Sequence, residues 1–109
     1  MTVNEYLQRG NYMYSELEGV RKRLHCKDGF SISVQASRFH YCTPRVTNAA
    51  YYETVELGYP SEVDATITDY AEDTNYTDTV YGYVPVHIVD TLIQKHGGID
   101  ESFLKEDLA

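Results

Sequence analysis

Apolar and polar residues alternate one by one along residues 30–37, and this pattern is the clearest structural signal in the chain. The apolar positions of the alternation are Phe30, Ile32, Val34 and Ala36. Serine and glutamine occupy the positions between them. Because successive side chains of a strand point to opposite faces, a period of two predicts a half-buried β-strand.

The N-terminal residues show a helical spacing instead. Thr2 and Glu5 stand three residues apart, which is the arrangement of a capping box at the start of a helix. An apolar stripe at gaps of three and four residues follows, made of Tyr6, Gly10, Met13, Leu17, Val20 and Leu24. This stripe predicts an amphipathic helix over residues 1–26, with the basic residues 21–23 in its last turn.

Two more strands and a closing helix are expected downstream. Residues 50–60 and 79–85 have the composition of strands, whereas residues 61–73 favour a short helix followed by a polar loop. Pro85 suits the start of a helix because it lacks a backbone N–H, and the two glycines at 97–98 suit its end. The expected buried side of this helix consists of Val86, Val89, Leu92, Ile93 and His96.

These elements predict a single α+β domain over residues 1–109. A small antiparallel β-sheet of 3–5 strands would be packed by an N-terminal helix over 1–26 and a C-terminal helix. The β-rich core with its closing helix would cover 30–99, leaving 100–109 as a tail. No apolar run approaches the roughly 18 residues that cross a bilayer, and the N-terminus lacks the pattern of a signal peptide. We therefore expect a cytoplasmic location, without membrane contact and without a disulfide between Cys26 and Cys42.

Negative charge is concentrated in the second half of the chain. The net charge is −8, and residues 46–94 contain no Lys or Arg. The acids of this stretch are Glu53, Glu56, Glu62, Asp64, Asp69, Glu72, Asp73, Asp78 and Asp90. The chain also has eleven tyrosines and no tryptophan, and tyrosine is enriched in protein interfaces. This distribution predicts repulsion of nucleic acid and attraction to a basic protein surface, although solubility and a half-buried sheet are the alternative explanations.

The two cysteines and two of the histidines form the close pairs His25-Cys26 and His40-x-Cys42. Residues two apart on a strand face the same side, so His40 and Cys42 are suited to hold one ion. If the fold brings the two pairs together, the four side chains, or Asp28 in place of His25, would complete a tetrahedral zinc site. The alternative is that both cysteines are ordinary buried core residues.

Residues with catalytic potential are not arranged as in known types of active site. Cys42 and His40 stand too close along a strand to meet as nucleophile and base. The adjacent acids Glu72 and Asp73 resemble a solvated face, and Gly82 alone does not make a phosphate-binding loop. The sequence therefore predicts that the chain is not an enzyme.

Four segments carry a resemblance to known proteins: SVQASRFHYCTPR, VELGYPS, TVYGYVPV and HGGI, between residues 33 and 99. They resemble segments of small proteins carried by phages and prophages of Gram-positive gut bacteria. The chain also resembles, in size, charge and type of source, the anti-CRISPR proteins that inhibit Cas9. This resemblance implies a protein of the bacterial host cytoplasm that binds Cas9 and blocks DNA binding or cleavage.

Under this hypothesis, acids and tyrosines of the second half would contact the basic partner. The charge would come from Glu53, Glu56, Asp69, Glu72, Asp73 and Asp78, and the contact area from Tyr70, Tyr76, Tyr81 and Tyr83. Two other functions stay open. One is a zinc-stabilised interaction module with an unrelated partner. The other is a protein that sequesters a small anionic signalling ligand in a tyrosine-lined pocket, with Arg38 or Arg45 meeting the anion.

Overall fold

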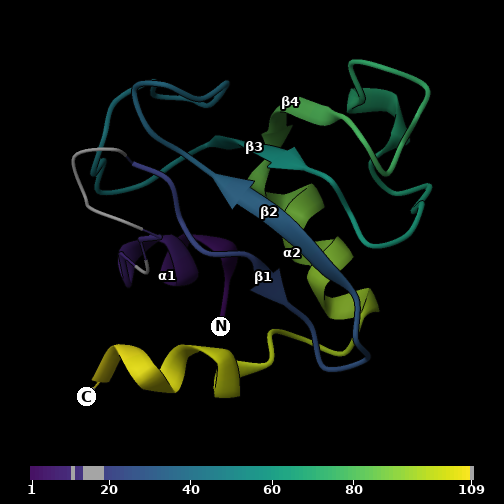
Figure 1. Cartoon of the computed structure of the whole chain (residues 1–109). Coiled ribbons are helices and arrows are strands. Elements are labelled where there is room, and N and C mark those ends of the chain that lie inside the picture. The colour runs from purple at the N-terminus through teal and green to yellow at the C-terminus, as the bar shows by residue number, and fades with distance from the viewer. Residues whose placement is uncertain (11, 14–18, 109) are drawn as a thin grey trace.

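A four-stranded antiparallel sheet forms the centre of the molecule (Figure 1), in the order β1-β2-β3-β4. The structure is a computed structural model, and it describes residues 1–10, 12–13 and 19–108. The strands are β1 (Leu24–His25), β2 (Ser31–Gln35), β3 (Thr54–Gly58) and β4 (Val80–Pro85). A short loop joins β1 to β2, whereas longer connections lead from β2 to β3 and from β3 to β4.

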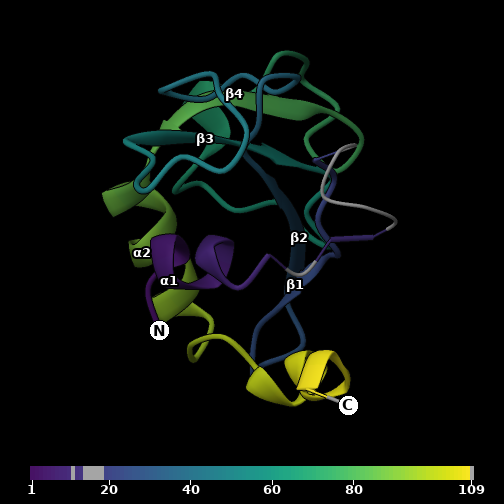
Figure 2. The ribbon, with the colours of Figure 1, turned by 90° about the vertical axis from the view of Figure 1, so that its left-hand side faces the viewer.

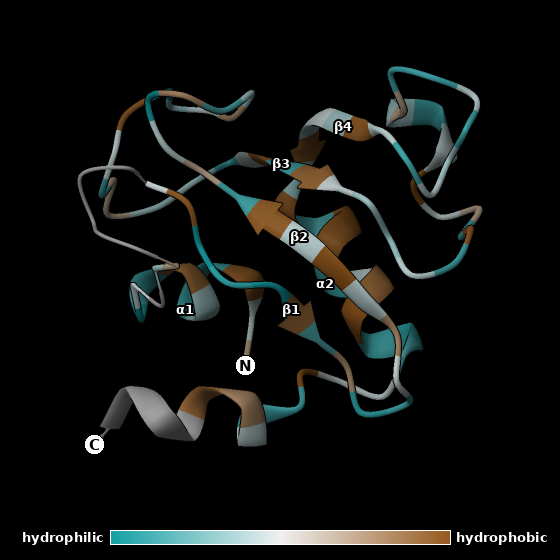
Figure 3. Cartoon of the chain, in the orientation of Figure 1, coloured by the Kyte–Doolittle hydropathy of each residue, from teal (hydrophilic) through white to brown (hydrophobic). Residues whose placement is uncertain are grey.

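Two α-helices pack on one side of this sheet (Figure 2), which confirms the predicted α+β class. They are α1 (Val3–Gln8) and α2 (Val86–Lys95), and α1 packs against α2. Two 3-10 helices complete the chain, η1 (Thr68–Tyr70) and η2 (Glu101–Leu108). Hydrophobic residues gather on β2, β3 and the part of α2 that faces them (Figure 3), and the core lies between these layers.

The alternation of β2 determines which of its side chains enter the core. Phe30, Ile32, Val34 and Ala36 are all buried, as predicted. Gln35 is buried too, although its position in the alternation is polar. Its amide group accepts from the backbone N–H of Arg21 at 2.7 Å and donates to the backbone carbonyl of the same residue at 2.8 Å. The side chain thus replaces the backbone pairing that a neighbouring strand would supply.

The predicted helix over residues 1–26 is wrong beyond its first turns. The capping box of Thr2 and Glu5 is present, but α1 ends at Gln8. Gly10 then has a φ of +80°, which a continuing helix does not allow. Leu24 is instead a strand residue that pairs with Ile32 of β2 and is fully buried. Leu17, part of the predicted stripe, lies outside the described residues.

The predicted helix over residues 61–73 is reduced to the three residues of η1. Ser61, expected to begin this helix, pairs with the chain at Ser31 instead, through its backbone N–H and its hydroxyl oxygen. The Asp64 carboxylate accepts from the backbone N–H of Thr66 at 2.9 Å and so closes a local turn. Polar side chains that would cap a helix are used here to fix a loop.

The closing helix agrees with its prediction. α2 follows Pro85 and buries Val89, Leu92 and Ile93. Gly97 and Gly98 both have positive φ values and end it. The tail continues as η2, and its Phe103 ring stacks on His25 at 3.8 Å between ring centroids.

Replacing Gln35 by alanine should lower the free energy of unfolding by about 1–3 kcal/mol, because it leaves a buried N–H and a buried carbonyl of Arg21 without partners. Urea denaturation followed by circular dichroism measures this loss. Gln94→Ala on the exposed side of α2 is the matched control, and we expect it to change stability by less than about 0.5 kcal/mol. Equal effects of the two variants would contradict the role assigned to Gln35.

Candidate functional site

An irregularity in the pairing of β3 with β4 brings Tyr83 to the surface. The register shifts between Val55 and Leu57, and Tyr83 has a φ of +53°, a left-handed conformation that is rare for a bulky residue. Tyr81 and Tyr83 would share a face on a regular strand. Here Tyr81 is fully buried, whereas Tyr83 is 49% exposed. The irregularity therefore separates a core tyrosine from a surface tyrosine.

The loop after β2 supplies an aromatic neighbour for Tyr83. The backbone N–H of Tyr83 donates to the carbonyl of Tyr41 at 3.1 Å. The two rings stack with centroids 5.7 Å apart and an angle of 27° between their planes. The Arg45 guanidinium lies 5.3 Å from the centre of the Tyr41 ring, and Arg38 lies 4.7 Å from the centre of the Phe39 ring. Each of these two exposed rings thus has a guanidinium group of the same loop near its face.

Two carboxylates stand beside the stacked tyrosines. Glu56 of β3 accepts from the backbone N–H of Tyr41 at 3.0 Å. Glu72 is held next to β4, because its backbone N–H donates to the Val80 carbonyl at 3.0 Å. A Cβ placed on Gly82 would lie 3.6 Å from Glu72 Oε2 and 3.4 Å from Tyr41 Cβ. We call this group, made of Tyr41, Glu56, Glu72 and Tyr83, the tyrosine–carboxylate cluster.

The remaining residues predicted to contact a partner differ in their exposure. Glu53, Asp69, Asp73 and Asp78 are exposed, whereas Tyr70 and Tyr76 are partly buried. Tyr81 was predicted as a contact residue, and this is wrong because none of its surface is accessible. Its hydroxyl donates to the Tyr76 carbonyl at 2.6 Å inside the loop before β4.

Sequence reasoning missed Phe39 and Tyr41 as surface aromatics. Both are exposed, at 53% and 39%, while the neighbouring Cys42 is buried. His40 is partly buried, so inward and outward positions alternate from 39 to 42. The period of two of β2 does not continue into this loop, because residues 35–37 are all buried and residues 38 and 39 are both exposed. The alternation of β2 therefore could not identify the two exposed rings.

The fold does not bring the two Cys/His pairs together as a zinc site. The backbone of Cys26 forms an isolated antiparallel β-bridge with Ile99, and the His25 ring stacks on Phe103. Cys42 donates instead to the Ser37 carbonyl at 3.2 Å, and His40 Nδ1 lies 2.6 Å from the Ser37 hydroxyl. Within residues 1–10, 12–13 and 19–108, no three His, Cys, Asp or Glu side chains are grouped to hold a metal.

Both cysteines are free thiols in the core, which agrees with the alternative interpretation of them. Burial, with a smaller contribution from the nearby charge of Asp28, raises the pKa of Cys26 to about 11. Burial also raises the pKa of Cys42. A raised pKa keeps both groups protonated near neutral pH, where a thiol is a poor metal ligand and a poor nucleophile.

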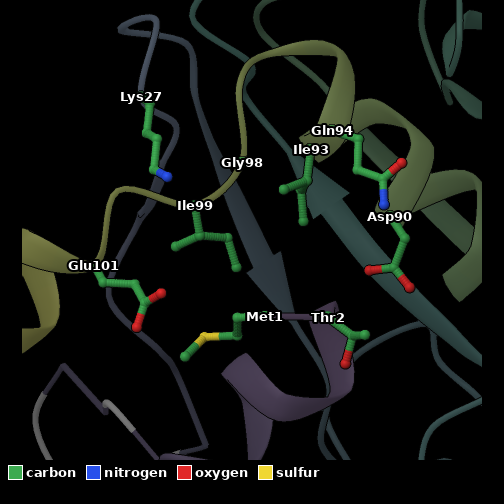
Figure 4. A pocket seen from close by; sticks show the side chains of 9 residues that line it. All are labelled: Met1, Thr2, Lys27, Asp90, Ile93, Gln94, Gly98, Ile99 and Glu101. Carbon is green, nitrogen blue, oxygen red and sulfur yellow. The ribbon is translucent and has the colours of Figure 1, made fainter.

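A hollow of about 240 Å³ lies between the N-terminus, α2 and the start of the tail (Figure 4). Lys27, Asp90 and Glu101 are the charged residues among those that line it. The Asp90 carboxylate already accepts from the backbone N–H of Val3 at 2.7 Å. The lining contains no tyrosine and neither Arg38 nor Arg45, so this hollow is not the predicted tyrosine-lined anion pocket.

His96 is the centre of a polar cluster that the sequence did not reveal. Its Nδ1 lies 2.7 Å from Asp28 Oδ2, and its Nε2 lies 2.8 Å from Asp64 Oδ2. Lys95 Nζ donates to the other Asp64 oxygen at 3.0 Å, and the His96 ring stacks on Phe30. We call Asp28, Asp64, Lys95 and His96 the histidine clamp.

The clamp favours the charged forms of His96 and Asp64. Burial alone would lower the pKa of His96, but the hydrogen bonds to Asp64 and Asp28 raise it above its ordinary value. Burial alone would raise the pKa of Asp64, yet hydrogen bonds from Thr66, His96 and Lys95 hold it well below its ordinary range. Within the residues that the structure describes, no side chain with an activated nucleophile adjoins this clamp, and we assign it to the fold.

No family model, curated protein or solved structure matches this chain significantly. No described helix has both the length and the apolar composition to cross a membrane.

Stability should fall as the pH rises from 6.5, the ordinary pKa of histidine. Because the folded pKa of His96 is raised, its charged form contributes stability that is complete below the unfolded pKa and is lost as the pH rises through the folded pKa. The lowered pKa of Asp64 acts in the opposite direction, so its contribution is lost only in strong acid. Urea midpoints measured across this range test the expectation.

His96→Gln is the variant that separates this effect from general alkaline destabilisation. It should be less stable than the parent and lose the dependence on pH just above 6.5. His87→Gln, on the exposed side of α2, should keep the parental profile. A parental profile in His96→Gln would show that the clamp does not set the pH dependence.

Proposed function

We propose that this chain is a non-enzymatic inhibitor that binds a basic protein surface of a bacterial host, specifically a Cas9 nuclease, and blocks its binding or cleavage of DNA. The observation that carries the proposal is the tyrosine–carboxylate cluster. Its two stacked tyrosines are exposed and stand beside Glu56 and Glu72. Exposed tyrosines at the centre of a polar rim are the usual energetic anchors of protein interfaces.

The charge around the cluster supports a basic partner. Residues 46–94 contain no Lys or Arg, so the charged residues of β3, η1 and the connections around them are all acidic. The arginines next to the cluster, Arg38 and Arg45, come from the loop after β2. Glu53, Asp69, Asp73 and Asp78 add exposed carboxylates on the same elements and their connections. Cas9 holds its guide and target in channels lined by Lys and Arg. An acidic surface with tyrosine anchors is complementary to such a channel in charge and competes with DNA for it.

Titration into a Cas9–guide complex tests the proposed function directly. We expect cleavage of a matched DNA target to fall to background near one equivalent of the protein at physiological salt. A parallel measurement of DNA binding to the same complex identifies the blocked step. Unchanged cleavage by several Cas9 orthologues would remove Cas9 as the partner.

Reversing the charge of Asp69, Glu72 and Asp73 together to lysine should slow association with Cas9 and weaken its dependence on salt. The physical reason is that long-range attraction between opposite charges accelerates encounter and is screened by ions. Stopped-flow or biolayer interferometry at several salt concentrations measures the effect, which we expect to reach about tenfold or more at low salt.

The matched control changes the same charge elsewhere. Glu101→Lys lies in the tail, at the opposite end of the molecule from η1 and β4 in Figure 1, and alters the net charge as much as Glu72→Lys alone. We expect Glu72→Lys to slow association more than Glu101→Lys does. Equal slowing would show that net charge, and no particular surface, drives the encounter.

A further inference from the structure

Aromatic rings on the loop after β2 already hold guanidinium groups from within the chain. Arg38 lies over Phe39 and Arg45 lies over Tyr41, at 4.7 and 5.3 Å from the ring centres. A guanidinium over an aromatic face is attracted by the negative charge density of the ring. This part of the surface is therefore built to bind arginine side chains.

Tyr83 is the member of this aromatic group that lacks a cation. It stacks on Tyr41 and is 49% exposed, and none of the positively charged side chains described lies over its ring. The Glu72 carboxylate, which faces Gly82 directly before Tyr83 in β4, is exposed and has no hydrogen bond or ion pair with the described part of the chain. Tyr83 thus offers an open ring, and the residue before it faces a carboxylate that has no partner among the described residues.

Gly82 leaves space between the Glu72 carboxylate and Tyr41, the residue on whose ring Tyr83 stacks. The point where a Cβ would stand on Gly82 lies 3.6 Å from Glu72 Oε2 and 3.6 Å from Tyr41 Cδ2. A side chain at this position would contact both the Glu72 carboxylate and Tyr41. Glycine leaves this space free, and the glycine has no positive φ that would require it for backbone reasons.

We infer that the corner formed by Glu72, Gly82 and Tyr83 is the binding site for one arginine side chain of the partner protein. This inference rests on the proposed function and specifies the residue type that the tyrosine–carboxylate cluster recognises. The guanidinium would lie against the Tyr83 ring and donate to the Glu72 carboxylate. Arg45 and Arg38 show that planar guanidinium groups fit the neighbouring rings.

Arginine fits this corner better than lysine for two reasons. Its planar group stacks on a ring while its N–H groups, which lie in the plane, reach a carboxylate at the ring edge. It also pairs with a carboxylate through two parallel hydrogen bonds, whereas an ammonium group acts as a point charge. The corner therefore predicts preference for arginine over lysine at equal charge.

The backbone of Tyr83 provides a way to separate binding from folding. Its φ of +53° is disfavoured for tyrosine and unrestricted for glycine, so Tyr83→Gly removes the ring and relieves the backbone at once. If the ring served the fold, this variant would lower the melting temperature. If the ring serves binding, the variant keeps or raises the melting temperature and binds arginine more weakly.

The direct test uses the tripeptides acetyl-Gly-Arg-Gly-amide and acetyl-Gly-citrulline-Gly-amide, which differ in the charge and donors of one side chain. Titrated to tens of millimolar in two-dimensional NMR, the arginine peptide should shift the backbone amides of Glu72, Gly82 and Tyr83. The citrulline peptide should not shift them, and the matched lysine peptide should shift them less. Equal shifts with citrulline, shifts centred elsewhere, or no shifts would overturn the inference.

Four variants at three positions complete the test. Glu72→Gln and Tyr83→Gly should each weaken the arginine shifts about tenfold, and Tyr83→Phe should retain them because the ring and not the hydroxyl makes the contact. Gly82→Ala should also weaken them, since its methyl group fills the corner without a backbone clash. Parental shifts in Glu72→Gln would contradict the role of the carboxylate.

The peptide titration tests the arginine site and the nuclease assay tests the proposed function, so either proposal can fail without the other. Arginine-specific shifts without inhibition of Cas9 would keep the corner and remove Cas9 as the partner. Inhibition of Cas9 that is unchanged by Glu72→Gln and Tyr83→Gly would keep the proposed function and overturn the corner as its arginine site.

Discussion

The imidazole of His96 joins three parts of the chain that are far apart in the sequence. It bonds Asp28 in the turn between β1 and β2, and Asp64 in the connection between β3 and β4, while its own backbone ends α2. Lys95 adds a second positive group, so two carboxylates face two cations. Both imidazole nitrogens of His96 and both carboxylate oxygens of Asp64 take part in hydrogen bonds. Buried charges are tolerated when they are paired and hydrogen-bonded in this way.

This clamp determines where the connection between β3 and β4 can run. With Asp64 fixed against α2, the chain turns through η1 and returns along β4, where Ala71 bridges to Tyr81. That return places the carboxylate of Glu72 beside Gly82. The acidic surface is thus a consequence of a fixed loop, although the residues of the clamp take no part in it themselves.

The proposed binding face combines two segments of opposite character. The loop after β2 supplies Tyr41 together with Arg38 and Arg45, and β4 with its preceding connection supplies Tyr83 and Glu72. Under the proposal, exposed rings near a carboxylate would discriminate between partners better than net charge alone. Charge accelerates the approach of a basic partner, and the ring with its carboxylate decides which side chain is retained.

Elements whose pattern is local were predictable from the sequence. The alternation of residues 30–36, the capping box of Thr2, and the Pro and Gly residues that bound α2 all describe structure within a few neighbouring residues. The length of α1 was not predictable in this way. Tyr6, Gly10 and Leu24 fit a helical stripe. Leu24 is nevertheless a strand residue, fully buried and paired with Ile32. Pairing with the following strand β2 overrode the helical spacing.

The candidate site shows the same division. Its acids and tyrosines could be named from composition, but their exposure depended on the register shift between β3 and β4, which buries Tyr81 and exposes Tyr83. The histidine clamp could not be found at all, because its partners lie 68 and 32 residues from His96. The sequence by itself determined the fold class, the apolar face of β2 and the net charge, since these follow from periodicity and counting. Only the tertiary structure decided which side chains meet, because contacts between residues far apart in the sequence depend on how the whole chain folds.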